Sequence, residues 1–341
     1  MPEPLTASRT KGENGPASAP FAGLTPEVVL DAVESAGLRA DGRQLALNSY
    51  ENRVYQVGIE GGPPLVAKFY RPGRWSDAQI LEEHGFSLAL EGAEIPVVSP
   101  LKLRGRTLHE FGGFRFALFP RRGGRPPNLE DRETLSWLGR FLGRIHAIGA
   151  TRPFAERPAL DLESFGREPR AWLLEHALIP ADLLEAWTSV SGQALEGAAR
   201  CFERAGRIAG IRLHGDCHAG NVLWTDAGPH FVDFDDSRTG PAVQDLWMLL
   251  SGERDAAEKQ LSELVAGYEE FREFDFRELQ LIEALRTLRL LHYSAWLARR
   301  WDDPAFPAAF PWFGTQRYWQ DRILELREQI AAMEEPPLAL V

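Results

Sequence analysis

The residues of this chain best suited to chemistry are concentrated in one stretch, 214–245, with the sequence HGDCHAGNVLWTDAGPHFVDFDDSRTGPAVQD. It contains six Asp, three His and one Asn, interrupted by two short apolar runs. The runs, 222–224 and 230–232, flank an Asp-Ala-Gly-Pro segment that is typical of a turn. The stretch therefore predicts a β-hairpin with polar side chains at both outer ends.

Three oxygen-bearing side chains lie at these outer ends. Asp216 and Asn221 precede the first strand and Asp233 follows the second, so antiparallel pairing brings them together. Carboxylate and amide oxygens suit Mg²⁺, which takes few protein ligands and completes its shell with substrate phosphates. A kinase catalytic loop has the same layout: an Asp for the attacking hydroxyl, an Asn five residues later and a further Asp on the metal. We therefore expect Asp216 to be catalytic and Asn221 and Asp233 to bind Mg²⁺.

Two other interpretations of this stretch stay open. His214, Asp216 and His218 alternate beside Cys217 in the manner of a zinc site, but no second His cluster follows at a suitable interval. Alternatively, the aspartates are turn formers and the histidines are hydrogen-bonded core residues. The zinc interpretation leaves the five-residue spacing from Asp to Asn unexplained. Turn chemistry alone rarely calls for Asp-Phe-Asp-Asp beside His-Gly-Asp, so we prefer the Mg²⁺ interpretation.

Phosphate chemistry also needs a cation, and Lys68 is the candidate. It lies in VAKFY, which predicts a strand, and such a strand lysine can bind the α- and β-phosphates of ATP. The alternative is a lysine that protects a sheet edge from aggregation. The following helix should supply a carboxylate that orients Lys68, either Glu82 or Glu83. We prefer Glu83 because it shares a helical stripe with Phe86 and Leu90.

The segment expected to cover the phosphates lacks a GxGxxG motif. Over 47–53 it is LNSYENR, without glycine. Side chains and backbone amides of such a loop can still contact phosphate, and Ser49 is the candidate for a contact with ATP. The alternative is an ordinary polar turn, which the composition of the loop fits nearly as well.

The elements that must position these residues include a hairpin and a helix in the first half of the chain. Runs at 54–59 and 65–70, separated by Gly-Gly-Pro-Pro, predict the hairpin. A helix over 77–92 should follow, with Ser76 as its N-cap and Gln79 completing a capping box.

Two further strands are expected near 97–103 and 114–119, and helical patterns dominate beyond them. The pattern predicts an α+β fold with two unequal lobes. We expect a flexible arm over 1–24, a small β-rich N-lobe over 25–120 that binds ATP, and a larger helical C-lobe over 121–335 that carries the catalytic and metal-binding loops. The Pro- and Gly-rich stretch PRRGGRPP lies at the boundary between the lobes.

Four other features have two interpretations each. Asp245 is expected to support the catalytic loop rather than react, and His146 to be a core residue. Cys217, beside the expected base, is a candidate for redox sensitivity. The aromatic-rich stretch 293–319 either lines a substrate pocket or packs in the core, and core packing explains most aromatic residues.

Composition limits the class of protein. The chain has 341 residues, with 38 Lys and Arg against 49 Asp and Glu, and a net charge of -11. This balance argues against binding to nucleic acid or to anionic lipid. Two cysteines are too few for a disulfide framework, and no run has the apolar length of a membrane span or a secretory signal. We expect a cytoplasmic monomer without nucleic-acid or membrane partners.

The motifs HGDCHAGN and FVDFDD resemble those of the aminoglycoside phosphotransferase/choline kinase superfamily. Within it, LNSYENRVYQ, KFYRPGRW, ILEEH, RLHGDCHAGN, GPAVQDLWML and WDDPAFPAAFPW are similar to segments of a family of bacterial stress-response kinases. The resemblance implies a bilobal protein-kinase-like fold, Mg²⁺ as cofactor, and ATP-dependent phosphorylation of protein on Ser or Thr in the cytoplasm under stress. By the same motifs it implies a catalytic Asp216, Mg²⁺ ligands Asn221 and Asp233, and an ATP contact at Ser49. The chain departs from protein kinases in having Asp-Phe-Asp for Asp-Phe-Gly, so the usual activation-loop switch is not expected.

The leading hypothesis is therefore a Mg²⁺- and ATP-dependent serine/threonine protein kinase whose partners are ATP and protein substrates. The runner-up is a kinase of the same fold that acts on a small molecule such as an amino alcohol, a sugar or an aminoglycoside. A third hypothesis, from another class, is a catalytically idle nucleotide-sensing module.

Overall fold

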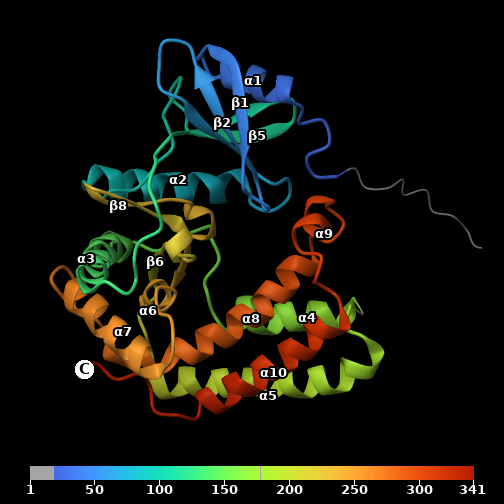
Figure 1. The fold of residues 1–341 in the computed structure, drawn as a ribbon, viewed down its shortest axis with the longest axis vertical. Helices are drawn as coiled ribbons and strands as arrows, with labels where there is room; N and C mark the ends of the chain where they lie inside the picture. The colour runs from blue at the N-terminus through green and yellow to red at the C-terminus, as the bar shows by residue number, and fades with distance from the viewer. Residues whose placement is uncertain (1–18, 177) are drawn as a thin grey trace, which may run out of the picture.

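The computed structural model describes residues 19–176 and 178–341, and it shows a small lobe built on a sheet beside a larger helical lobe (Figure 1). The α+β, bilobal architecture expected from the sequence is confirmed. Most of the predicted arm, residues 1–18, lies outside the described residues. Of the rest, Phe21 packs its ring 4.5 Å from the guanidinium of Arg53. The division into arm, N-lobe and C-lobe at residues 24 and 120 stays a prediction.

The N-lobe is a five-stranded antiparallel sheet in the order β1-β2-β3-β5-β4. The predicted hairpin is confirmed, because β2 and β3 pair directly and place Val54 opposite Lys68. The strands are β1 (Ala40–Leu47), β2 (Arg53–Ile59), β3 (Leu65–Phe69), β4 (His109–Phe111) and β5 (Phe114–Pro120).

Two helices accompany this sheet. Helix α1 (Pro26–Ser35) buries its apolar residues in a cluster with Phe69 and Phe116 of the sheet. Helix α2 (Asp77–Gly92) lies between the sheet and the C-lobe (Figure 1). Its predicted capping box is confirmed, since Ser76 accepts from the amide of Gln79 and the Gln79 side chain accepts from the amide of Ser76.

One expectation for the sheet was wrong, and one strand was missed. Residues 97–103 form no strand; they make single ladder bonds, from Val98 N to Phe231 O (2.9 Å) and from Leu101 N to Leu118 O (2.7 Å). The flanking Pro96 has no N–H to extend such a ladder. Conversely, the sequence pattern did not predict β1, because most of its side chains are exposed and polar and apolar residues do not alternate along it.

The C-lobe is mainly helical and contains two short antiparallel strand pairs. Its core includes an apolar stripe on α3, with Leu135, Leu138, Leu142 and Ile145 buried. The helices are α3 (Arg132–Gly149), α4 (Glu168–Glu175), α5 (Ala181–Ala205), α6 (Val243–Trp247), α7 (Arg254–Glu269), α8 (Ile282–Ala298), α9 (Ala305–Ala309) and α10 (Gln316–Ala332). The strand pairs are β6 (Ile211–Leu213) with β9 (Arg238–Gly240) and β7 (Val222–Thr225) with β8 (Gly228–Phe231).

The hairpin predicted in the 214–245 stretch is β7–β8. Its turn is shorter than expected, because Gly228 and Pro229 already pair with Thr225 and Trp224. Asn221 therefore directly precedes one strand, and Asp233 follows the other by two residues. Within 19–176 and 178–341, none of the helices has the length and apolar character needed to cross a membrane.

Candidate active site

A cleft of about 790 Å³ lies between the two lobes and brings all six predicted site residues together. The N-lobe contributes three of them, from the β1–β2 loop, from β3 and from α2. The C-lobe contributes the other three, from the loop after β6 and from the two ends of the β7–β8 hairpin. The six are Ser49, Lys68, Glu83, Asp216, Asn221 and Asp233. Their roles stay predictions; their convergence in one cleft is a property of the fold.

The loop that carries Asp216 is held by a buried carboxylate. Asp245 accepts hydrogen bonds from the backbone amides of His214 and Gly215, both at 2.8 Å, and its Oδ2 lies 3.0 Å from Nε2 of His146. Gly215 has a φ of 86°, and a Cβ there would overlap the carbonyl oxygen of Asp236. The structural role expected for Asp245 and the core position expected for His146 are therefore confirmed.

The carboxylate of Asp216 is surrounded by groups that favour its charged form. Its Oδ1 lies 2.8 Å from the guanidinium of Arg289, and its Oδ2 lies 3.5 Å from Nε2 of His218. Burial would raise the pKa of Asp216, but the hydrogen bond from His218 and the charge of Arg289 outweigh it and lower this pKa. An ionised carboxylate at this position can accept a proton from an acceptor hydroxyl.

Lys68 joins the N-lobe sheet to the loop that follows β8 in the C-lobe. Its Nζ lies 2.9 Å from Asp233 Oδ1, 3.3 Å from Asp235 Oδ1 and 4.0 Å from Glu83 Oε1. Burial alone would lower the pKa of Lys68, but the three carboxylates outweigh it and raise the pKa well above its ordinary value. Lys68 is thus a buried, charged cation rather than a solvated residue on a sheet edge.

Glu83, not Glu82, faces this lysine. Burial raises the pKa of Glu83, and its other oxygen lies 3.5 Å from Arg157. Glu82 instead points out of the cleft and accepts three backbone N–H bonds from residues 155–157. The geometry therefore agrees with the choice made from the helical stripe.

The donor set at the hairpin ends fits a hard divalent cation. The amide nitrogen of Asn221 donates to the carbonyl oxygen of Asp216 at 2.9 Å, so its Oδ1 is left for another partner. Asp233 has a φ of 60° and a side chain that is 54% exposed to the cleft. Oxygen donors of this kind, with space beside them for phosphate, suit Mg²⁺.

The zinc interpretation and the redox interpretation of this loop were both wrong. The Nε2–H of His214 donates to Val232 O at 2.8 Å, and its Nδ1 accepts from the amide of Asp216 at 3.3 Å, so neither nitrogen is free to bind metal. Across the described ranges, no three His, Cys, Asp or Glu residues are grouped as a metal site. Cys217 is fully buried, and burial raises its pKa well above the ordinary value, which disfavours the reactive thiolate.

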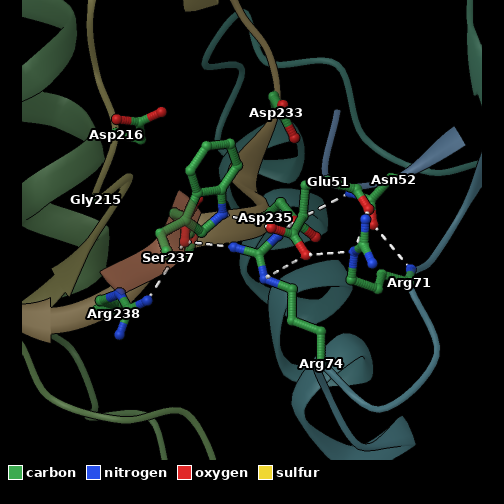
Figure 2. A network of polar contacts seen from close by, with 12 residues as sticks. Glu51, Asn52, Arg71, Arg74, Gly215, Asp216, Asp233, Asp235, Ser237 and Arg238 are labelled. Atoms are coloured by element: carbon green, nitrogen blue, oxygen red, sulfur yellow. Dashed lines mark hydrogen bonds and ion pairs between the residues drawn. The ribbon is translucent and has the colours of Figure 1, made fainter. Parts of the chain in front are cut away.

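Sequence reasoning missed a buried polar network beside Lys68, drawn in Figure 2. Arg74 forms ion pairs with Asp235, Asp236 and, at 3.7 Å, with Glu51. Asn52 donates to Asp235 at 3.1 Å and accepts from the amide of Arg71, also at 3.1 Å. Only the DFDD run hinted at this network. The cations of the network, Arg71 and Arg74, come from the loop between β3 and α2, far from this run in the sequence.

The same network ties the β1–β2 loop to the C-lobe. Glu51 accepts a hydrogen bond from Trp296 Nε1 and pairs with Arg300, both at 2.5 Å. Asp303, just before α9, pairs with Arg71 at 2.5 Å, and Figure 1 shows α9 on the side of the C-lobe nearest the sheet. Residues of the C-lobe therefore hold the β1–β2 loop in place.

The aromatic stretch 293–319 divides between the two expected roles. Tyr293, Trp296 and Phe310 line the cleft. Phe313 and Trp319 are buried in a core cluster of the C-lobe instead. Core packing and cleft lining thus both occur.

The bilobal fold and a cleft built from a strand lysine, a helix glutamate and an Asp–Asn–Asp set define a kinase-like phosphotransferase. The family pattern described as "Phosphotransferase enzyme family" (APH) matches residues 43–282. Stress response kinase A of Salmonella choleraesuis (strain SC-B67) is 47% identical over 320 residues, which cover 94% of this chain and 97% of that protein. The chain therefore belongs to the phosphotransferase enzyme family, and it is a kinase-type enzyme.

Two further comparisons bear on its relatives. A protein of Salmonella typhimurium (strain LT2) named serine/threonine protein kinase RdoA is 46% identical with the same coverage. The solved structure of amicoumacin kinase hAmiN in complex with AMP-PNP, Ca²⁺ and Ami has a TM-score of 0.69 and 20% identity, and the match covers 90% of this chain and 93% of that one. The structural match shows the fold. The resemblance to bacterial stress-response kinases seen in the sequence is confirmed.

Proposed function

We propose that this enzyme is an ATP- and Mg²⁺-dependent serine/threonine protein kinase of the bacterial stress response. The observation that carries the proposal is the meeting of Lys68, Asp216, Asn221 and Asp233 in one interlobe cleft. The name of the 46% identical relative supports a protein substrate. The names of the 45–47% identical relatives support a role under stress. A cytoplasmic, monomeric protein without nucleic-acid or membrane partners remains part of the proposal.

Each residue has a part in this proposal that follows from its surroundings. Asp216, ionised beside Arg289 and His218, orients the acceptor hydroxyl and takes its proton. Asn221 and Asp233 hold Mg²⁺, which supplies charge stabilisation across the transferring phosphates. Lys68, oriented by Glu83, offers its positive charge to the phosphates in place of its ion pair with Asp233. Ser49 in the β1–β2 loop covers the nucleotide.

The protein contributes to catalysis mainly by positioning the substrates, because the β1–β2 loop is held in place and the ion pairs of the cleft are already formed. Phosphoryl transfer needs little covalent participation from the protein, because the transition state is stabilised by charges already in place. Asp245 serves this by accepting hydrogen bonds from the backbone amides of His214 and Gly215, so that Asp216 keeps its direction.

The test is transfer from γ-labelled ATP in the presence of Mg²⁺ to a generic protein, and separately to a panel of amino alcohols, sugars and aminoglycosides. The wild type is compared with Asp216→Asn and with Asp226→Asn, an exposed turn residue that serves as the matched control. We expect label on Ser or Thr of protein, lost in Asp216→Asn with ATP binding retained, and unaffected in Asp226→Asn.

Other outcomes would replace this proposal. Label found only on a small molecule identifies the enzyme as a small-molecule kinase of the same fold. ATP binding without any transfer favours the nucleotide-sensing module. Equal loss of ATP binding and transfer in Asp216→Asn contradicts the role given to Asp216.

A further inference from the structure

One face of helix α8 forms the wall of the cleft on the side of Asp216. Arg289, His292, Tyr293 and Trp296 all line the cleft, and their spacing of three, four and seven residues from Arg289 places them on one helical stripe. The acceptor hydroxyl must approach Asp216 to be phosphorylated. The chemistry of this stripe therefore bears on which acceptors fit.

The carboxylates around the cleft already have cationic partners. In the part of the chain that the structure describes, each carboxylate lining the cleft lies within an ion-pair distance of a Lys or Arg side chain. The pairs are Glu51–Arg300, Glu83–Lys68, Asp216–Arg289, Asp233–Lys68, Asp235–Arg74 and Asp236–Arg238. An acceptor with an ammonium group near its hydroxyl would have to displace one of these cations.

Neither Trp296 nor His292 supplies a substitute for a free carboxylate. Trp296 is the strongest cation–π partner on the stripe, but the guanidinium of Arg300 already lies 5.3 Å from its ring centroid. His292 is stacked on Phe165 with ring centroids 4.1 Å apart, and burial lowers its pKa to about 3, so it is neutral and adds no charge of either sign. The charge of this wall is therefore that of Arg289.

Arg289 can reach an acceptor as well as Asp216. Its side chain is 37% exposed in the cleft, and its guanidinium has several N–H donors, of which the contact with Asp216 Oδ1 at 2.8 Å uses one nitrogen. An arginine placed in this way binds a carboxylate strongly and repels a nearby cation.

We propose that the acceptor is a protein segment with an acidic side chain close to the phosphorylated Ser or Thr, and that Arg289 recognises this carboxylate. The proposal rests on the function proposed above and adds the substrate class. It also predicts that polycationic amines are poor acceptors, because the ammonium group meets Arg289 beside the reactive hydroxyl.

The test uses two sets of synthetic peptides with the same central Ser, flanked by Asp and Glu in one set and by Lys and Arg in the other. For the wild type we expect kcat/KM to be at least tenfold higher for the acidic set, mainly through KM, with the difference shrinking as salt is raised. Arg289→Gln should remove the preference, and Arg289→Glu should reverse it. Arg327→Glu, the same charge change at an exposed position outside the cleft, should leave the preference intact.

The proposal can be tested even if the Arg289 variants fail to fold or to bind ATP. Competition by Ser→Ala versions of both peptide sets against wild-type enzyme reports binding without any substitution in the enzyme. Equal competition by the two sets, or an acidic preference that persists in Arg289→Gln, overturns the inference while the protein-kinase function stands. Label on amino alcohols or aminoglycosides with none on any peptide overturns both.

Discussion

The Nζ atom of Lys68 lies 2.9 Å from Oδ1 of Asp233, a residue 165 positions further along the chain. This contact joins the middle of the N-lobe sheet to the end of the β7–β8 hairpin in the C-lobe. The two lobes therefore share one charge centre in the cleft, and phosphates entering the cleft would meet the lysine and the carboxylate proposed to bind metal together.

Replacing Lys68 by Met should lower the turnover number for phosphoryl transfer by roughly 10²–10³-fold, because a preorganised positive charge at the phosphates is removed. Steady-state kinetics with an ATP titration measures the effect. Lys259→Met, at an exposed position on α7, is the matched control and should behave as wild type. Wild-type turnover in Lys68→Met would contradict the role proposed for this residue.

Asp245→Ala should destabilise the fold by about 2–5 kcal/mol, because two buried backbone N–H groups lose their acceptor. Asp245→Asn keeps one acceptor oxygen and should cost less. Urea unfolding measures the free-energy change, and the transfer assay shows whether the loop still directs Asp216. A stability loss in Asp245→Ala no larger than that of an exposed Asp→Ala change would show that the amides of His214 and Gly215 find other partners.

Glu278 makes the stability of the C-lobe depend on pH. Its Oε2 accepts from Val243 N at 2.7 Å, and burial raises its pKa to about 7 from an ordinary 4.5. The folded protein therefore holds a proton that the unfolded chain releases. The stability contributed by this proton is fully present below about pH 4.5 and is lost as pH rises through 7.

Glu278→Gln should consequently raise the free energy of unfolding at pH 8 by up to about 3 kcal/mol, and with it the melting temperature. At pH 4.5 it should bring no gain. Thermal unfolding of both proteins across this range measures the difference. An equal gain at both pH values would show that the effect is not protonation of this carboxyl group.

Two helix glycines should respond to alanine in opposite directions. A Cβ on Gly139 would overlap the carbonyl oxygen of Leu264 where α3 packs on α7, so Gly139→Ala should destabilise by about 1–3 kcal/mol. A Cβ on Gly85 in α2 meets no heavy atom within 4 Å, so Gly85→Ala should stabilise by about 0.5–1 kcal/mol. Chemical denaturation of the two variants decides the signs. Stabilisation by Gly139→Ala would contradict the close α3–α7 contact, and destabilisation by Gly85→Ala would contradict the open space beside Gly85.

Features that depend on near neighbours in the chain could be predicted from the sequence. The Ser76–Gln79 capping box, the β2–β3 hairpin and the β7–β8 hairpin each form within a short stretch, so their signals are local. The Asp216-to-Asn221 spacing is local too, and one hairpin was enough to bring Asp233 to the same place. Residues 97–103 have the composition of a strand, but they lie between two different sheets and each sheet pairs with a single amide of the segment.

The sequence by itself determined the class of chemistry and gave the candidate residues for it, because side-chain type and spacing limit which metal and which phosphate contacts can form. Only the tertiary structure decided their environment. Arg289 beside Asp216, Arg74 beside Asp235 and Trp296 beside Glu51 are partners separated by 73, 161 and 245 positions. Such pairs arise from the packing of one lobe or one helix against another, and no pattern along the chain specifies which distant cation will meet which buried carboxylate.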